Sequence, residues 1–242
     1  MNVLAIGNSF SQDATRYLSN IALAQGKHWS VVNLFIPGCP LERHFRNMLS
    51  GERAYSLEFN GQSTGFYVSL DEALLSRSWD VITIQQASPS SAKKRTYQPY
   101  LHELVLHIRK YCPQAKLYLH ETWAYDQSFH MLGEWYGKGT AEDMYRDVVR
   151  CYREAEKEEA FDGLIPSGEL VHALLENGVP KIHRDGFHLS YGLGRYAVGL
   201  LWLRMLTGIS VSENTFSCFD EAVSADEIAL AKKLVDGFAP LI

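Results

Sequence analysis

The stretch NVLAI-GNSF-SQDA, residues 2–14, decides the fold more than any other part of the chain. Residues 2–6 are apolar enough to form a short buried strand, and residues 11–23 carry apolar or aromatic side chains at helical spacing. Ser9 therefore lies between a strand and a helix, at the edge where open α/β sheets bind ligands. The start of a helix offers unpaired N–H groups to a developing anion. The alternative is that Ser9 or Ser11 only caps the helix.

Strand-like and helical patterns alternate along the rest of the chain. Further strands are predicted at residues 29–36, 80–86, 116–120 and 163–166. Helices are predicted at residues 41–49, 97–112, 140–159, 167–176, 191–207 and 224–238, and an aromatic-rich loop at 122–138. Residues 55–70 alternate around Asn60-Gly61, which predicts a β-hairpin excursion. The alternation favours a mainly parallel sheet with helices on both faces, in one domain over residues 1–242.

The composition is that of a soluble globular protein, with 46% hydrophobic and 21% charged residues. A net charge of −5 gives no reason to expect nucleic acid or an anionic membrane as a partner. The four cysteines show no metal-binding or paired spacing, and no apolar run is long enough to span a bilayer. The N-terminus lacks the pattern of a signal peptide. We therefore expect a cytoplasmic protein; the sequence does not indicate its oligomeric state.

A carboxylate and an imidazole stand three residues apart in the segment RDGFH, residues 184–188. A histidine that accepts a proton from a serine needs an acceptor, usually a carboxylate, on its other ring nitrogen. Asp185 and His188 are candidates for these roles, with Ser9 as the nucleophile. Taken alone the pattern is weak, since Asp185-Gly186 also suits a simple turn.

Stabilisation of an oxyanion would require hydrogen-bond donors at the same sheet edge. Gly38 follows the second predicted strand, and the absence of a side chain lets its N–H approach a substrate. Gln85 and Gln86 end the third predicted main strand and offer amide donors. Each has a simpler explanation when judged alone, because Pro37-Gly38 suits a turn and a glutamine suits a polar strand end.

Together these motifs resemble the SGNH (GDSL-type) hydrolase superfamily. Its blocks correspond to GNSF at residues 7–10, PGC at 37–39 and DGFH at 185–188, in the right order along almost the whole chain. Two features depart from the pattern: Asn8 replaces the usual aspartate, and IQQAS at residues 84–88 replaces the block Gly-x-Asn-Asp. This looks like a branch known mainly as a domain of unknown function, with a Leu/Ile-Gln-x-x-Ser signature. The resemblance implies that a glutamine replaces the oxyanion asparagine, Gln85 rather than Gln86.

The resemblance also implies a flavodoxin-like three-layer α/β/α sandwich and ester hydrolysis without a metal or other cofactor. Members of the superfamily often remove acetyl groups from carbohydrates, so the expected partner is a small-molecule or carbohydrate ester. Trp123 and Tyr125, in the predicted loop at the active edge, could stack on a sugar ring or cover the core of their own loop. Arg184 could bind a substrate carboxylate or a surface acid.

The sequence also bears on four alternatives. A catalytically silent carbohydrate-binding module on the same scaffold is supported by the missing Asn-Asp block. A nucleotide-binding protein is disfavoured because the first strand is not followed by GxGxxG and no GxxxxGK[ST] occurs. An α/β-hydrolase is disfavoured because the chain has no GxSxG. A metal site at His183, Asp185 and His188 is also disfavoured, since no fourth ligand is evident.

Overall fold

The computed structural model describes residues 1–137 and 139–241, and the strands of this part form one seven-stranded sheet. Lys138, the last residue of the predicted loop, and Ile242 lie outside the described residues. The strand order is β4-β3-β2-β1-β5-β6-β7. The strands are β1 (Asn2–Gly7), β2 (Ser30–Phe35), β3 (Tyr55–Phe59), β4 (Gln62–Val68), β5 (Val81–Ile84), β6 (Lys116–His120) and β7 (Gly163–Ile165).

The order in which strands are added to the sheet changes direction at β1, which makes this strand the topological switch point. This strand pairs in parallel with β2 on one side and with β5 on the other. The chain therefore builds outward from β1 in one direction, returns, and builds outward in the other through β6 and β7. Open α/β folds bind ligands at such a point, beyond the carboxyl ends of the strands. The segments that follow β1, β2 and β5 all emerge there, as the sequence predicts.

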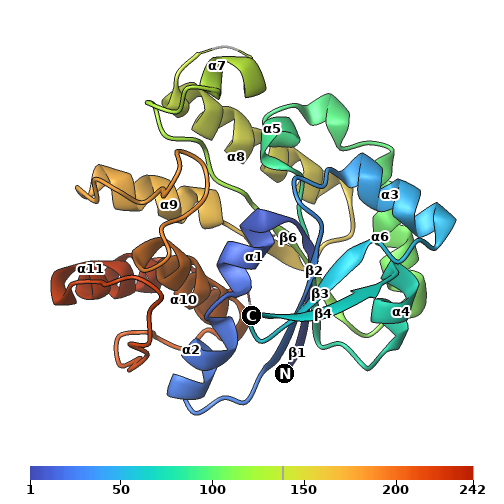
Figure 1. Cartoon of the computed structure of the whole chain (residues 1–242), viewed down its shortest axis with the longest axis horizontal. Coiled ribbons are helices and arrows are strands. Elements are labelled where there is room, and N and C mark those ends of the chain that lie inside the picture. The colour runs from blue at the N-terminus through green and yellow to red at the C-terminus, as the bar shows by residue number, and fades with distance from the viewer. Residues whose placement is uncertain (138, 242) are drawn as a thin grey trace.

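Helices cover both faces of the sheet. Figure 1 shows α1, α2 and α10 on one side and α3, α4 and α6 on the other, which confirms the predicted three-layer α/β/α arrangement. No helix in the described part of the chain has the length and apolar character needed to cross a bilayer. The helices are α1 (Ser9–Thr15), α2 (Leu18–Ala24), α3 (Leu41–Ser50), α4 (Leu70–Leu75), α5 (Ser88–Ser91), the 3₁₀ helix η1 (Lys94–Thr96), α6 (Tyr100–Tyr111), α7 (Leu132–Trp135), α8 (Ala141–Glu158), α9 (Ser167–Glu176), α10 (Leu193–Thr207) and α11 (Ala225–Asp236).

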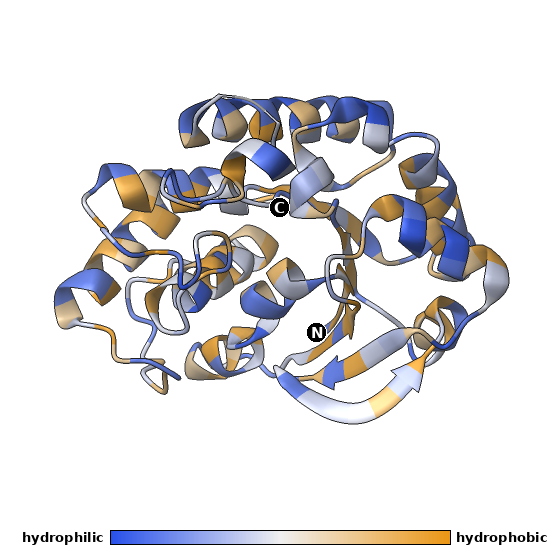
Figure 2. Cartoon of the chain, turned by 45° about the horizontal axis from the view of Figure 1, so that its top comes forward, coloured by the Kyte–Doolittle hydropathy of each residue, from blue (hydrophilic) through white to orange (hydrophobic). Residues whose placement is uncertain are grey.

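The core lies between the sheet and these helices. All four residues of β5 and most residues of β1 are buried, and Figure 2 shows hydrophobic colour along the central strands. Helix α10 is buried on almost every side, because it contacts α1, α2, α9 and α11. Its apolar residues therefore occur all round the helix, as expected for an element in the interior.

The predicted hairpin is confirmed, and its turn explains a break in the first helix. Residues 11–23 were expected to form one helix, but the structure has α1 and α2 with Arg16 and Tyr17 between them. Gly61, at the hairpin turn, packs so closely that a Cβ there would lie 2.1 Å from the Arg16 carbonyl oxygen. The Arg16 guanidinium in turn donates to the Gly61 carbonyl oxygen at 2.8 Å. The hairpin thus packs against the break.

Three short helices and the 3₁₀ helix were not predicted. Helix α4 has a complete capping box between Ser69 and Glu72, as α11 has between Ser224 and Glu227. Helix α7 lies inside the segment predicted to be a loop, and α5 and η1 are single turns. Elements this short carry too little periodicity to be distinguished from a loop.

Glu121 follows β6 directly and is fully buried. One of its oxygens accepts from the Glu169 N–H at 3.0 Å, at the start of α9, and the other has no hydrogen-bond partner among the described residues. Burial, reinforced by repulsion from Glu169, raises the pKa of Glu121 to about 8. The carboxyl group therefore binds its proton more tightly in the folded protein than in the unfolded chain.

Replacing Glu121 with Gln should change how stability depends on pH. Because its folded-state pKa of about 8 lies above the ordinary value of 4.5, Glu121 favours the folded state most below pH 4.5. That contribution is lost as the pH rises toward 8. Between these limits the free energy of unfolding of the wild type should fall relative to Glu121→Gln by up to about 1.4 kcal/mol per pH unit. Urea denaturation at several pH values measures this difference. Glu134→Gln, on the exposed side of α7, is the control and should parallel the wild type. Equal slopes for Glu121→Gln and the wild type would contradict the prediction.

Candidate active site

Asn8 forms the turn between β1 and α1. Its backbone is extended (φ −143°, ψ −153°), and its side-chain oxygen accepts from the Phe10 N–H at 3.0 Å. Asn8 is thus the helix cap, and the alternative that Ser9 or Ser11 caps the helix is wrong. The Ser11 hydroxyl instead lies 2.8 Å from the Asn8 carbonyl oxygen and 2.7 Å from Asn33 Oδ1. Ser9 is the first residue of α1, and its hydroxyl is left for another partner.

The partner of Ser9 is His188. Ser9 Oγ lies 2.8 Å from His188 Nε2, and His188 Nδ1 lies 2.7 Å from Asp185 Oδ2. Because a carboxylate can only accept, Nδ1 carries the ring proton, and the lone pair of Nε2 faces the Ser9 hydroxyl. The structure therefore brings the three predicted residues together, in the order and orientation that a proton transfer from Ser9 requires.

Asp185 is held in its charged form. Partial burial opposes ionisation, but hydrogen bonds from the His188 ring, the His188 N–H and the Phe187 N–H outweigh it and lower the pKa of Asp185. The two backbone bonds, at 2.8 Å and 3.3 Å, both reach Oδ1 and leave Oδ2 to the imidazole. Asp185 is therefore an anion at neutral pH. Its charge is available to stabilise a protonated His188.

The loop that carries Asp185 and His188 is closed on itself and packed against the segment after β6. His183 and Leu189 form an antiparallel bridge across its base. Gly186 has φ +92°, which favours glycine, and a Cβ there would lie 2.6 Å from the Phe129 ring. The Gly186 carbonyl oxygen accepts from the Asp126 N–H at 2.7 Å. Glycine is thus required at this position for both backbone conformation and space.

Asp13 joins this loop to the helix that carries Ser9. It is fully buried and lies four residues after Ser9, on the same face of α1. Its carboxylate accepts from Arg184 Nη1 at 2.9 and 3.0 Å, from the Leu189 N–H at 3.1 Å and from Arg195 Nε at 2.8 Å. Arg184 precedes Asp185 and Leu189 follows His188, so one carboxylate holds both ends of the segment.

This contact corrects both predicted partners of Arg184, a substrate carboxylate and a surface acid, because Asp13 is fully buried. The Arg184 guanidinium binds the buried carboxylate of Asp13 and also donates to the Leu189 carbonyl oxygen. Sequence analysis missed Asp13 and Arg195. A charged residue one helical turn after Ser9 was the only available signal, because its partners lie 171 and 182 residues away.

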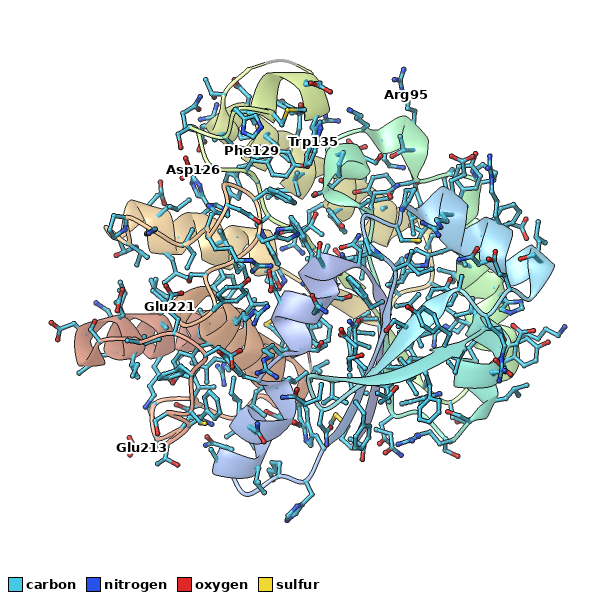
Figure 3. All side chains as sticks on the ribbon, in the orientation of Figure 1. Arg95, Asp126, Phe129, Trp135, Glu213 and Glu221 are labelled. Atoms are coloured by element: carbon cyan, nitrogen blue, oxygen red, sulfur yellow. The ribbon has the colours of Figure 1, made fainter. Side chains whose placement is uncertain are left out.

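Trp123 and Tyr125 are buried. Trp123 is 0% exposed, stacks on the Phe10 ring at 4.1 Å and donates to the Phe187 carbonyl oxygen at 2.7 Å. Tyr125 is 1% exposed and donates to Ser88 Oγ at 2.9 Å. Of the two predicted roles, stacking on a sugar is contradicted by this burial, and filling the core of the loop is confirmed. Figure 3 labels other residues of this segment, Asp126, Phe129 and Trp135, at the top of the molecule.

Gly38 lies in the exposed turn after β2, next to a residue bonded to Asn8. It has φ +59°, and the following Cys39 carbonyl oxygen accepts from Asn8 Nδ2 at 3.2 Å. The turn is thereby tied to the residue that precedes Ser9. The N–H of Ser9, at the first position of α1, has no acceptor within its own helix. Ser9 and Gly38 therefore each bring a backbone N–H to this edge of the sheet.

The two glutamines after β5 have separate partners. Gln86 accepts from the Leu41 and Ala87 N–H groups, and its Nε2 donates to the carbonyl and hydroxyl oxygens of Thr96 at 3.0 and 3.1 Å. Both of its amide hydrogens are thus engaged away from Ser9, which contradicts its predicted role as an oxyanion donor. Gln85 Nε2 donates to Asn8 Oδ1 at 2.9 Å. Gln85 therefore faces the residue before Ser9.

The described part of the chain contains no cluster of metal-ligating side chains. No group of three or more His, Cys, Asp or Glu side chains within residues 1–137 and 139–241 is placed to hold a metal ion. His183, considered as a ligand, donates from Nε2 to the Ala124 carbonyl oxygen at 3.1 Å. A cavity of about 390 Å³ lies between the segment after β6 and helices α8 and α9, lined by Tyr125 and His172 among others. Ser9, Asp185 and His188 do not line it.

Comparison with known proteins identifies a close relative. The family model described as "Domain of unknown function (DUF4886)" matches residues 2–236. A DUF4886 family protein from Bacteroides uniformis has a crystal structure that is 33% identical, with a TM-score of 0.91, over 98% of this chain and 93% of that one. No curated protein matches the chain.

More distant similarities show the fold. A protein from Slackia heliotrinireducens that is assigned to the SGNH hydrolases is 20% identical, with a TM-score of 0.60, over 83% of this chain and 95% of that one. An acetyl xylan esterase is 13% identical, with a TM-score of 0.56, over 85% of this chain and 100% of that one. The chain therefore has the fold of the SGNH hydrolases, as its motifs predict.

Replacing Asp13 with Asn should destabilise the protein strongly. The change leaves two partly buried guanidinium groups without their shared carboxylate, and loss of one partner of a buried ion pair typically costs about 3–5 kcal/mol. Urea denaturation measures this loss. Asp220→Asn is the matched control, because Asp220 also binds Arg195 but is 33% exposed, and it should cost less than about 1 kcal/mol.

Hydrogen exchange gives a local test of the same contact. The Leu189 amide, which donates to Asp13, should exchange faster in Asp13→Asn than in Asp220→Asn. Equal losses of stability in the two variants, with an unchanged Leu189 amide, would show that Asp13 does not hold the loop.

Proposed function

We propose that this chain, which belongs to the DUF4886 family, is a metal-independent serine ester hydrolase that removes small acyl groups, acetyl in particular, from carbohydrates. The observation that carries the proposal is the hydrogen-bonded series from Asp185 to His188 to Ser9, with distances of 2.7 and 2.8 Å. Each bond has the direction that general-base activation of a serine requires. In this proposal Ser9 is the nucleophile, His188 the general base and Asp185 the group that orients the imidazole.

The reaction proceeds in two halves. His188 Nε2 takes the proton from Ser9 Oγ as the oxygen attacks the ester carbonyl carbon, and Asp185 offsets the charge on the imidazolium. Collapse of the tetrahedral intermediate breaks the bond to the alcohol, which leaves with the proton from His188. A water molecule then attacks the acyl-serine, again giving its proton to His188, and the acid is released.

Two backbone donors stabilise the oxyanion in this mechanism. The Ser9 N–H lies at the start of α1, where the helix dipole also favours negative charge. The Gly38 N–H lies in the turn that Asn8 holds through the Cys39 carbonyl oxygen. Loss of one such donor in other enzymes costs about 2.7–4 kcal/mol of transition-state stabilisation. In this proposal each of the two N–H groups contributes stabilisation of that order.

The surroundings of His188 favour a small acyl group. The Phe187 ring lies 3.9 Å from the imidazole and the Phe10 ring 5.9 Å away, so apolar side chains crowd the base. The Asp185 side chain is 43% exposed, so the site opens at the molecular surface. A small acyl group on a large, hydrated alcohol such as a carbohydrate fits this combination. The acetyl xylan esterase that shares the fold acts on an ester of this kind.

Ser9→Ala should reduce kcat for p-nitrophenyl acetate by several orders of magnitude, because it removes the attacking oxygen. The melting temperature should change little, since among the described residues the Ser9 hydroxyl is bonded to His188 alone. Ser128→Ala, in the exposed segment after β6, is the control and should keep full activity. Retained hydrolysis by Ser9→Ala would remove the serine mechanism.

Covalent labelling separates the enzyme from a silent binding module on the same scaffold. A fluorophosphonate should label the wild type at Ser9 and leave Ser9→Ala unlabelled. An unlabelled wild type that binds oligosaccharides would favour the binding module. Activity that survives exhaustive chelation is also expected, and loss of activity on chelation would contradict a metal-independent reaction.

Asp185→Asn should reduce kcat by about 10²–10⁴-fold at neutral pH, because an amide no longer fixes the Nδ1–H tautomer of His188 or offsets its charge. KM should change much less. Asp126→Asn is a matched control, since its carboxylate lies near the same loop but accepts from Ser128. Steady-state kinetics of both variants test this. Equal activities would exclude Asp185 from the mechanism.

A further inference from the structure

Asn8 and Gln85, the two residues at which the chain departs from the SGNH pattern, are hydrogen-bonded to each other. Gln85 Nε2 donates to Asn8 Oδ1 at 2.9 Å, and both side chains are buried. Gly7 permits the close approach, because a Cβ there would lie 3.0 Å from Gln85 Cδ and 2.5 Å from Ser11 Oγ. The two departures therefore form one feature of the structure.

The backbone determines the direction of every bond in this group. The Phe10 N–H can only donate, so the Asn8 atom that faces it is the oxygen. Asn8 Nδ2 is then turned toward the Cys39 carbonyl oxygen. Because Asn8 Oδ1 can only accept, Gln85 must turn its Nε2 toward it, which leaves Gln85 Oε1 facing His120 Nδ1 at 2.8 Å.

His120 completes the series. Gln85 Oε1 can only accept, so His120 Nδ1 carries the proton, and the lone pair of Nε2 accepts from Ser167 Oγ at 3.0 Å. Ser167 is the first residue of α9, and His120 is the last residue of β6. His120 is fully buried, and burial lowers its pKa to about 3, which keeps the ring neutral. One tautomer therefore satisfies all four side chains.

We propose that Ser167, His120 and Gln85 are positioning residues that act on the catalytic site through Asn8. This inference rests on the proposed esterase function. The series fixes the Asn8 amide, which caps the helix that begins at Ser9 and holds the Cys39 carbonyl oxygen beside Gly38. Because Gln85 is fully buried, it orients the two backbone oxyanion donors in this proposal and does not itself contact the oxyanion. The role that the resemblance implied for Gln85, direct donation to the oxyanion, is replaced by this indirect one.

A double-mutant cycle of Asn8→Ala and Gln85→Leu tests the proposal. Each single variant should lower kcat for p-nitrophenyl acetate by about 10–100-fold, since a small misplacement of catalytic groups can have an effect of that size. KM should stay within about threefold of the wild type. The double variant should be no slower than the slower single variant, because both changes break the same series. Losses that multiply would show that Gln85 acts independently of Asn8, as a direct donor would, and would overturn the proposal.

Variants of His120 separate positioning from a structural role. In His120→Asn the side-chain N–H₂ takes the place of Nδ1–H and still donates to Gln85 Oε1, so kcat should remain within about fivefold of the wild type. His120→Leu leaves Gln85 without its donor and should lower kcat as Gln85→Leu does. His44→Leu is the control: His44 is also buried and neutral, but it bonds Tyr55 on the other face of the sheet, so kcat should not change. Equal kcat values for His120→Leu and His120→Asn would overturn the proposal.

The tautomer of His120 can be tested without any esterase activity. Nitrogen-15 chemical shifts at pH 7 should show a neutral His120 ring with the proton on Nδ1. A proton on Nε2, or a charged ring, would contradict the proposed hydrogen bonds of His120 with Gln85 and Ser167. A wild type that neither hydrolyses esters nor reacts with a fluorophosphonate would contradict the proposed function. The tautomer of His120 would still show whether the hydrogen bonds from Ser167 through His120 and Gln85 to Asn8 exist.

Discussion

The buried carboxylate of Asp13 is the interaction on which the candidate site depends. Ser9 lies on a helix that begins at residue 9, whereas His188 lies on a loop near the other end of the chain. Asp13 joins the two, because it is one turn from Ser9 and binds the residues on either side of the Asp185–His188 segment. A fully buried carboxylate is costly unless it is paired, and here two guanidinium groups and a backbone N–H supply the compensation. The bonds that compensate for burying the Asp13 carboxylate therefore also hold the imidazole of His188 next to Ser9.

A second buried polar side chain, that of Asn8, holds the residues on the other side of Ser9. Asn8 caps α1 and holds the turn of Gly38, and its own amide is oriented by Gln85 and His120. An aspartate at position 8 could still accept from the Phe10 N–H but could not donate to the Cys39 carbonyl oxygen. The asparagine is therefore needed for the bond to the Cys39 carbonyl oxygen, whereas an aspartate oxygen could also accept from Gln85. Differences from a family pattern that look independent along the sequence can be a single interaction in space.

The sequence predicts most of the sheet and helices because their signals are local. Apolar runs and helical spacing locate every strand and the long helices, and Asn60-Gly61 locates the hairpin. The motifs around Ser9 and His188 likewise predict which residues meet, since each follows a recognisable turn. The orientation of side chains is a different matter: Trp123 and Tyr125 fill the loop core, and Arg184 binds a residue 171 positions away. Adjacent glutamines at a strand end also face opposite ways, so spacing alone could not separate Gln85 from Gln86.

A crystal structure of the protein after reaction with an organophosphonate tests the central claim most directly. The account predicts phosphorus bonded to Ser9 Oγ, with the phosphoryl oxygen about 3 Å from the N–H groups of both Ser9 and Gly38. His188 should remain hydrogen-bonded to Asp185, and Gln85 Nε2 should remain hydrogen-bonded to Asn8 Oδ1. An unmodified Ser9, or a phosphoryl oxygen that faces away from these two N–H groups, would contradict the account.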